Sequence, residues 1–139
     1  MYSYFCNDWE VKSTFQQEYV TLWPSFLGLG KLHLLDEVTE FEWGRFNYLL
    51  KLIFKEYKIQ KVNHFTESLL DVEDINSVLS LYKDSMNKDA SKFSQFVLPE
   101  LNCIITEEWD FTYIVWHENN GAVNALSTFI SQADLYHFS

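Results

Sequence analysis

The sequence contains few of the residues that hold small secreted or metal-binding domains together. It has two cysteines, Cys6 and Cys103, which are too few for a disulfide framework. The cysteines form no C-x-x-C pair, and the four histidines occur in no H-E-x-x-H pattern. We therefore expect a protein without a metal or another cofactor.

Long hydrophobic runs are also absent. The most apolar stretch, residues 46–54, is interrupted by Lys51, and a membrane-spanning helix needs about 20 apolar residues. The first ten residues carry two acids and no base, which is unlike a secretory signal. These absences predict a cytoplasmic protein that does not insert into a membrane.

Positive charge is scarce. Ten Lys and Arg residues stand against 20 Asp and Glu residues, so the formal net charge is −10. Nucleic acids and anionic membranes are polyanions that recruit basic residues. The balance therefore argues against both as direct partners and favours a basic protein.

The chain nevertheless has ample material for a hydrophobic core. Of its 139 residues, 47% are hydrophobic and 25 are aromatic, counting 5 Trp, 8 Tyr and 12 Phe. A chain of this length is typical of one domain, and only four glycines and two prolines are present to form a linker. We expect residues 1–139 to form a single domain.

Helical periodicity occurs in four segments, which we expect to be helices. They are residues 8–22, residues 39–57, a helix that starts after Asp71 and whose apolar stripe runs over 75–86, and a last helix that includes 123–130. Asn119-Asn120-Gly121 is expected to supply a turn and the N-cap of the last helix. The second is the most regular, because Thr39-x-x-Glu42 is a capping box and apolar residues follow at helical spacing. Its apolar stripe consists of Phe46, Leu49, Leu50, Ile53 and Tyr57.

The C-terminal third has a different pattern. Residues 101–106 and 111–117 are short and rich in β-branched and aromatic side chains, which predicts an antiparallel hairpin with a loop at 107–110. The apolar tail, 135–139, is expected to dock as an edge strand or against the hairpin, and 24–35 to form a loop or a short extended piece. The predicted fold is α+β, a helix-rich domain with a C-terminal hairpin followed by a helix.

Acidic residues are concentrated towards the C-terminus. Residues 71–139 hold eleven acids and three bases, and no Lys or Arg follows Lys92. Within the predicted loop, Glu107, Glu108 and Asp110 surround Trp109. The acids either provide general solubility or form one anionic surface that attracts a basic protein. Trp109 either is exposed as an anchor for that partner or folds back onto the core.

The run from Phe96 to His117, FVLPELNCIITEEWDFTYIVWH, resembles small acidic immunity proteins of bacterial toxin–immunity loci. The resemblance lies in acidity, aromatic content and the small size of the chain. It implies a protein that binds a secreted toxin domain and blocks it. Immunity proteins have diverse folds, so the resemblance implies neither a fold nor particular residues.

The first hypothesis is therefore a non-enzymatic inhibitor of a basic toxin, such as a nuclease. Its binding residues would be Glu107, Glu108, Trp109, Asp110 and Glu118, whose carboxylates would take the place of substrate phosphates or cover an adjacent surface. Changing Glu107, Glu108 and Asp110 together to lysine should then abolish binding without unfolding the protein.

Two alternatives belong to other classes of protein. A small enzyme would use His117 with Glu118 or Asp110 as an acid–base pair, in a concave pocket. A self-associating protein would pair the edge of its C-terminal sheet across a two-fold axis.

Overall fold

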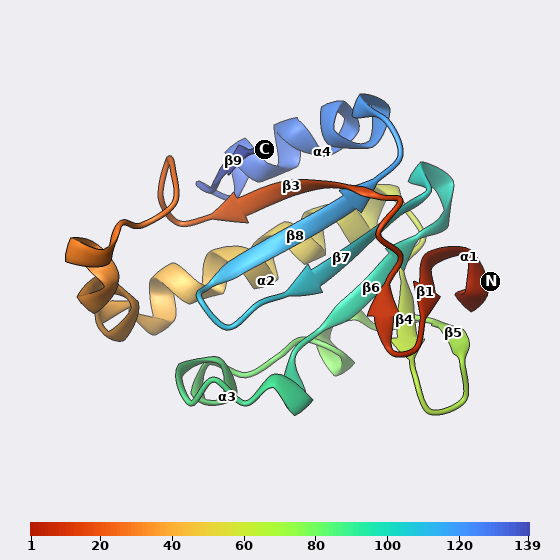
Figure 1. The fold of residues 1–139 in the computed structure, drawn as a ribbon, viewed down its shortest axis with the longest axis horizontal. Helices are drawn as coiled ribbons and strands as arrows, with labels where there is room; N and C mark the ends of the chain where they lie inside the picture. Colours follow the sequence, from red (N-terminus) through yellow and green to blue (C-terminus); the bar gives the residue numbers. More distant parts are fainter.

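One antiparallel sheet of seven strands runs through the molecule (Figure 1). The computed structural model describes residues 1–139. The strands lie in the order β5–β4–β6–β7–β8–β3–β9. They are β3 (Gln16–Thr21), β4 (Gln60–Asn63), β5 (Ser68–Asp71), β6 (Gln95–Leu98), β7 (Cys103–Glu107), β8 (Thr112–His117) and β9 (Tyr136–Phe138). Strand β3 lies between β8 and β9 and thus joins the beginning of the chain to its end.

Two long helices accompany the sheet, α2 (Glu40–Glu56) and α4 (Asn120–Gln132). The shorter elements are helices α1 (Tyr2–Phe5) and α3 (Tyr82–Met86), a two-stranded sheet of β1 (Cys6–Asn7) and β2 (Glu10–Val11), and the 3₁₀ helices η1 (Leu29–Glu37), η2 (Ile75–Ser77), η3 (Ala90–Lys92) and η4 (Pro99–Leu101). None of the helices combines the length and the apolar character that crossing a membrane requires.

The predicted fold class is wrong. The chain combines helices and strands, but in place of a lone C-terminal hairpin it has a seven-stranded antiparallel sheet, and β7 and β8 lie near the centre of that sheet. Strands β4, β5 and β6 lie in residues for which the sequence pattern predicted no strand. They have four residues each, which is too short for periodicity to distinguish them from loops.

The predicted helix over residues 8–22 is the largest single error. Residues 16–21 instead form β3, which pairs along its whole length with β8, from Gln16 opposite His117 to Thr21 opposite Thr112. Val11, Phe15, Tyr19 and Leu22 have helical spacing, but Tyr19, Val20 and Thr21 are residue types that favour a pleated, half-buried surface. The partner strand therefore overrides the weak local preference for a helix.

The predicted helix that starts after Asp71 is also wrong as a continuous element. It is divided into the 3₁₀ turn η2 and the five-residue helix α3. Residues 24–35 are predicted to form a loop or an extended piece. They add no strand, and from Leu29 onwards they belong to the 3₁₀ helix η1.

Other local predictions are confirmed. Helix α2 begins with the predicted capping box, in which the Thr39 hydroxyl accepts from the Glu42 N–H at 3.1 Å. Helix α4 is capped by Asn119, whose side chain accepts from the Gly121 N–H at 2.8 Å. A Cβ at position 121 would lie 2.8 Å from that same oxygen, so a larger residue there would displace the capping side chain. The C-terminal tail docks as the edge strand β9.

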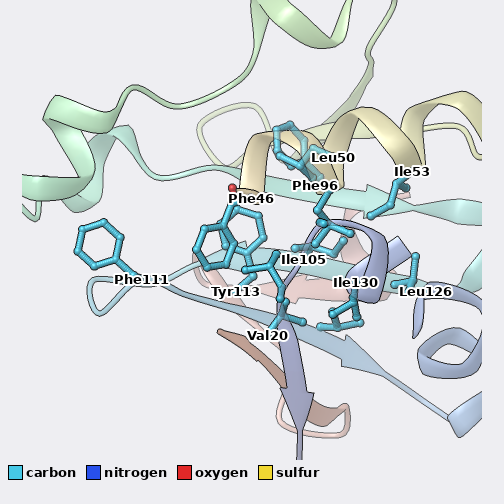
Figure 2. Packing of buried hydrophobic residues seen from close by; sticks show 14 of the residues in the cluster. Val20, Phe46, Leu50, Ile53, Phe96, Ile105, Phe111, Tyr113, Leu126 and Ile130 are labelled. Atoms are coloured by element: carbon cyan, nitrogen blue, oxygen red, sulfur yellow. The ribbon is translucent and has the colours of Figure 1, made fainter. Parts of the chain in front are cut away.

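Helices α2 and α4 pack against the same face of the sheet and bury the main core there (Figures 1 and 2). The inward stripe of α2 meets side chains from the central strands, as in the contact of Phe46 with Tyr113 at a ring-centroid distance of 4.7 Å. The residues labelled in Figure 2 come from β3, α2, β6, β7, the turn before β8, β8 and α4. Burial of this apolar surface is the main favourable term in folding.

The N-terminal segment covers part of the opposite face of the sheet. Its α1 and β1 bury a second cluster against β4, β6 and β7, and this cluster consists of Tyr2, Phe5, Cys6, Phe15, Val62, Val97 and Ile104. Over β3 and β9, Phe26 contacts Tyr19 and Phe138, each at a centroid distance of 4.7 Å. Both faces of the sheet therefore carry apolar side chains, as the two apolar faces of residues 111–117 suggest.

The turn between β1 and β2 has an unusual conformation. Asn7 pairs with Glu10, so Asp8 and Trp9 form a two-residue turn, and both have a positive φ, 52° and 69°. Positive φ at both positions is typical of a type I′ turn, which prefers Asn-Gly or Asp-Gly. Trp9 thus occupies a position that favours glycine, and 53% of its surface is exposed.

We expect Trp9→Gly to be more stable than Trp9→Ala. Both variants lose the contacts of the indole, but only alanine keeps the Cβ that makes left-handed backbone unfavourable, by about 1–2 kcal/mol per residue. Urea denaturation should therefore give a free energy of unfolding about 1 kcal/mol higher for the glycine variant. The reverse order would show that the turn is not left-handed at residue 9.

Candidate functional site

The turn between β7 and β8 presents Trp109 to solvent. The Glu108 N–H donates to the Thr112 carbonyl at 2.8 Å and closes the turn. Phe111 has a φ of 56° and is only 5% exposed, so its ring points inward and anchors the turn to the core. Trp109 is 51% exposed. We call Glu108, Trp109, Asp110 and Phe111 the Trp109 turn.

A cavity of about 210 Å³ lies beside the Trp109 turn. Its apolar lining comes from Trp109 and from the segment after β3, and comprises Trp23, Phe26, Leu27, Leu32, Leu35 and Trp109. Asp110 is the one charged residue in its wall. Phe26 and Leu32 are themselves exposed, so apolar surface continues from the cavity onto the outside of the molecule. We call this cavity the Trp109 cavity.

Sequence reasoning missed the contribution of residues 23–35 to this site. The segment was treated as a connection, although it holds Trp23, Phe26 and several leucines. So many large apolar residues in a predicted loop indicate that the segment packs against another part of the protein. That part is the Trp109 turn, because Thr21 pairs with Thr112 and the end of β3 therefore lies beside the turn.

Glu108 is half-buried and belongs to a hydrogen-bonded chain. The Trp116 Nε1–H donates to the Thr106 hydroxyl at 2.9 Å, and that hydroxyl donates to the Glu108 carboxylate, also at 2.9 Å. Burial raises the pKa of Glu108, and repulsion from Asp110 and Glu107 adds to the rise, while the bond from Thr106 opposes it. Neither Glu108 nor Asp110 has an ion-pair partner within the chain.

Glu107 does not belong to the exposed surface. It is the last residue of β7, is 6% exposed and points to the helical face of the sheet, where it lies opposite Tyr113. Its carboxylate accepts from the Ser85 hydroxyl at 2.7 Å and from the Ser94 N–H at 3.0 Å. Glu107 therefore fastens residues 85–94 to the sheet. A lysine here would bury an unpaired charge, so the triple lysine variant would lose its fold.

The structure does not bring Glu118 to the Trp109 turn. Glu118 follows the C-terminal end of β8, whereas the turn precedes its N-terminal end. Six strand residues separate the two ends by about 20 Å. Glu118 is instead an acceptor for the Tyr4 hydroxyl of the N-terminal helix. Of the five predicted binding residues, Glu108, Trp109 and Asp110 lie together.

The acids of the C-terminal third do not form one continuous surface. Asp134 lies 3.7 Å from Arg45 of α2 and pairs with it, and Glu100 accepts from the backbone N–H of Lys58 at 3.0 Å. One base from the middle of the chain therefore neutralises an acid that follows Lys92, and a backbone group binds another. Glu108 and Asp110 have no ion-pair partner, and together with Trp109 they form a small acidic site with an aromatic side chain at its centre.

The geometry gives no support to His117 as an acid–base catalyst. His117 is 2% exposed, and its Nδ1 lies 2.9 Å from the Asn119 carbonyl, where it holds the connection from β8 to α4. Asp110 is at the far end of β8, and Glu118 is exposed and bonded to Tyr4. His117 lines none of the five principal cavities.

A Ser–His–Glu arrangement does occur elsewhere. His137 of β9 places Nδ1 2.6 Å from Glu18 of β3, and its Nε2 lies 3.3 Å from the Ser127 hydroxyl. The order of atoms is that of a catalytic triad. However, Ser127 lies within α4, where backbone N–H groups are used by the helix and cannot form an oxyanion hole. We interpret these bonds as the attachment of β9 to α4 and β3.

The cysteines and the remaining acidic residues offer no further reactive group. Cys6 and Cys103 are free and buried, and burial raises the pKa of their thiols to about 11 and about 12. Both thiols are therefore protonated at neutral pH and are poor nucleophiles. No group of three or more His, Cys, Asp or Glu side chains is arranged to hold a metal ion.

The edges of the sheet give little support to self-association by pairing of edge strands. The two edge strands, β5 and β9, have four and three residues. Short edge strands offer few unpaired backbone groups to a second copy of the chain.

The adjacent acids Glu107 and Glu108 are expected to differ sharply in their effect on stability. Glu107→Ala leaves the buried Ser85 hydroxyl and Ser94 N–H without an acceptor, which costs about 1–3 kcal/mol for each unsatisfied group. Glu108→Ala removes a partly buried charge and should cost at least about 1 kcal/mol less. Urea denaturation of both variants measures the difference, and equal losses would contradict the assignment of Glu107 to the core.

Glu108→Gln should be stabilising in a pH-dependent way. Because the pKa of Glu108 is raised in the folded state, the folded protein binds more protons than the unfolded chain just above the ordinary glutamate pKa of about 4.3. This carboxyl therefore lowers stability as the pH rises. Glutamine keeps the acceptor for Thr106 without the charge. We expect a gain in the free energy of unfolding at neutral pH that disappears below the ordinary pKa; a gain independent of pH would contradict it.

Comparison with known proteins adds no assignment to this geometry. No protein-family model, no curated protein and no solved structure matches the chain.

Proposed function

We propose that this protein is a cytoplasmic binding protein that captures a basic protein, such as a toxin domain, at the Trp109 turn and blocks it. The observation that carries the proposal is the half-exposed Trp109, which stands beside Asp110 at an apolar cavity. Keeping so much indole surface in water is unfavourable for the isolated protein. Contact with a partner removes this cost.

The chemistry of the site fits the side chain of arginine or lysine. The aliphatic stem of such a residue can pack against Phe26 and Leu32, and its charged group can meet the Asp110 carboxylate. The indole face of Trp109 offers a cation–π contact worth about 0.5–2 kcal/mol. Tryptophan is also among the residues that most often dominate the energy of an interface.

The absence of internal ion pairs strengthens this interpretation. Glu108 and Asp110 have no Lys or Arg partner in the chain, so both are available to a basic partner. Burial, with repulsion from Asp110 and Glu107, raises the pKa of Glu108, and a nearby cation would favour the charged carboxylate and oppose that rise. The net charge of −10 steers a basic protein towards the molecule from a distance.

The resemblance to immunity proteins is consistent with this site. The run that carries it, Phe96 to His117, contains β7, the Trp109 turn and β8. Inhibition would follow because the bound protein covers the basic residues of the toxin. A toxin whose basic residues contact the Trp109 turn cannot use them to bind its substrate.

The test compares capture by the wild-type protein with capture by Trp109→Ala/Asp110→Lys. Both substitutions are in the turn and outside the main core, so the variant should keep its fold, which circular dichroism and thermal unfolding would check. We expect the wild-type protein to bind a basic domain and to protect cells that express it. Removing an aromatic anchor and reversing the charge should weaken binding by about a hundredfold or more.

Glu73→Lys is the matched control, because it makes the same charge reversal at an exposed acid away from the turn. This variant should bind the partner almost as the wild-type protein does. An acidic partner, or equal binding by Trp109→Ala/Asp110→Lys, would contradict the proposal.

A further inference from the structure

The largest of the principal cavities lies elsewhere, beside the β1–β2 turn. Its volume is about 660 Å³, within the range of small-molecule sites. It is formed by Trp9, by the end of β4 with the residues that follow it, and by the segment from η3 to β6. It shares no residue with the Trp109 cavity. We call it the Trp9 cavity.

The charge of the Trp9 cavity is opposite to that of the whole protein. Lys61 and Lys92 are in its wall, and no Asp or Glu is. Neither lysine forms an ion pair within the chain, and both are exposed. A chain with twice as many acids as bases thus lines its largest cavity with bases alone. Two unpaired ammonium groups at one cavity favour an anionic ligand.

The Trp9 indole presents a flat apolar surface at the cavity. Trp9 stacks on His64 with a centroid distance of 5.5 Å and an interplanar angle of 16°, and it contacts Phe65 edge-on at 4.6 Å. Phe65 is 86% exposed, and Trp9 is 53% exposed. A planar ring can stack on this surface, as nucleobases do on aromatic side chains.

His64 holds this aromatic surface in place. Its Nδ1 lies 2.7 Å from the Tyr2 hydroxyl, and its Nε2 lies 2.7 Å from the Gln95 Oε1. Both ring nitrogens are therefore engaged, and the imidazole plane that supports Trp9 is fixed by bonds to α1 and β6. A fixed platform lowers the entropy lost when a ring stacks on it.

Backbone strain gives an independent reason to consider Trp9 functional. Trp9 occupies a left-handed position that glycine fills more easily, and it keeps half its surface in water. Strained conformations of this kind concentrate at binding sites. The turn holds the indole at the mouth of the cavity at the expense of local stability.

We propose that the Trp9 cavity binds a small planar aromatic anion of the nucleoside phosphate class. The ring stacks on Trp9, and Lys61 and Lys92 bind the phosphate. The amide N–H groups of Asn63 and Gln95 are also in the wall and can donate to the edge of the ring or to the sugar, whereas the Ser91 hydroxyl donates to Asp89. The net negative charge repels a long polyanion more strongly than a single phosphate, which is small enough to contact the two lysines.

The probe is adenosine monophosphate, and binding is measured by isothermal titration calorimetry and by saturation-transfer NMR of the ligand. Adenosine should bind about tenfold more weakly, because it lacks the charge that the lysines bind. Inorganic phosphate should also bind more weakly, because it lacks the ring.

Two variants test the two halves of the site. Trp9→Gly removes the stacking surface and suits the backbone of the turn, so lost binding cannot be attributed to a distorted turn; we expect a loss of about tenfold or more. Lys61→Gln/Lys92→Gln should cause a loss at least as large, since it removes both charges. Lys51→Gln, at an exposed position of α2 outside the cavity, is the matched control and should bind normally.

Three results would overturn the proposal. The first is that adenosine monophosphate does not bind at millimolar concentration. The second is that inorganic phosphate binds as tightly as the nucleotide, and the third is that either the Trp9 variant or the double lysine variant binds normally. None of these results bears on the Trp109 turn, because the two cavities share no residue.

Discussion

The pairing of β3 with β8 is the constraint on which the rest of the structure depends. Six residues from the beginning of the chain pair with six from near its end, and β9 then adds to the free edge of β3. The register has a direct consequence for the surface. Because Thr21 lies opposite Thr112, the apolar segment that leaves β3 meets the Trp109 turn. A shift of one residue would turn every side chain of β3 to the other face and separate the two.

The carboxylates of the C-terminal third divide into distinct roles that depend on which way each residue points. Glu107 and Glu108 are neighbours in sequence and lie on opposite faces of the sheet. One is an internal acceptor that fixes residues 85–94, and the other is part of the exposed turn. Asp134 and Glu118 bond to groups from earlier in the chain. Charge counted along a sequence is therefore a poor measure of charge on a surface.

The two candidate sites use exposed tryptophans in similar structural settings. Trp9 and Trp109 each lie in a tight turn between antiparallel strands, and each turn contains a non-glycine residue with positive φ. About half of each indole is exposed. The charges beside them differ in sign, with Asp110 and Glu108 at one and two lysines at the other. The chain thus presents surfaces of opposite chemistry without a second domain.

The sequence by itself determined the elements whose stabilising groups are local. The Thr39–Glu42 capping box and the apolar stripe predict α2, Asn119 and Gly121 mark the start of α4, and the β-branched runs predict the β7–β8 hairpin. The sequence does not determine whether Trp109 is exposed, because its exposure depends on Phe111 taking the inward position in the folded turn.

Only the tertiary structure decided the seven-stranded sheet and the sites built on it. Strands β4, β5, β6 and β9 have three or four residues, and β3 depends on partners distant in sequence, such as His117 for Gln16 and Phe138 for Tyr19. A local pattern does not record such partners, so residues 8–22 carry helical spacing and still form a strand. The Trp9 cavity likewise joins residues 9, 61–65 and 90–95, which come together only when the chain has folded.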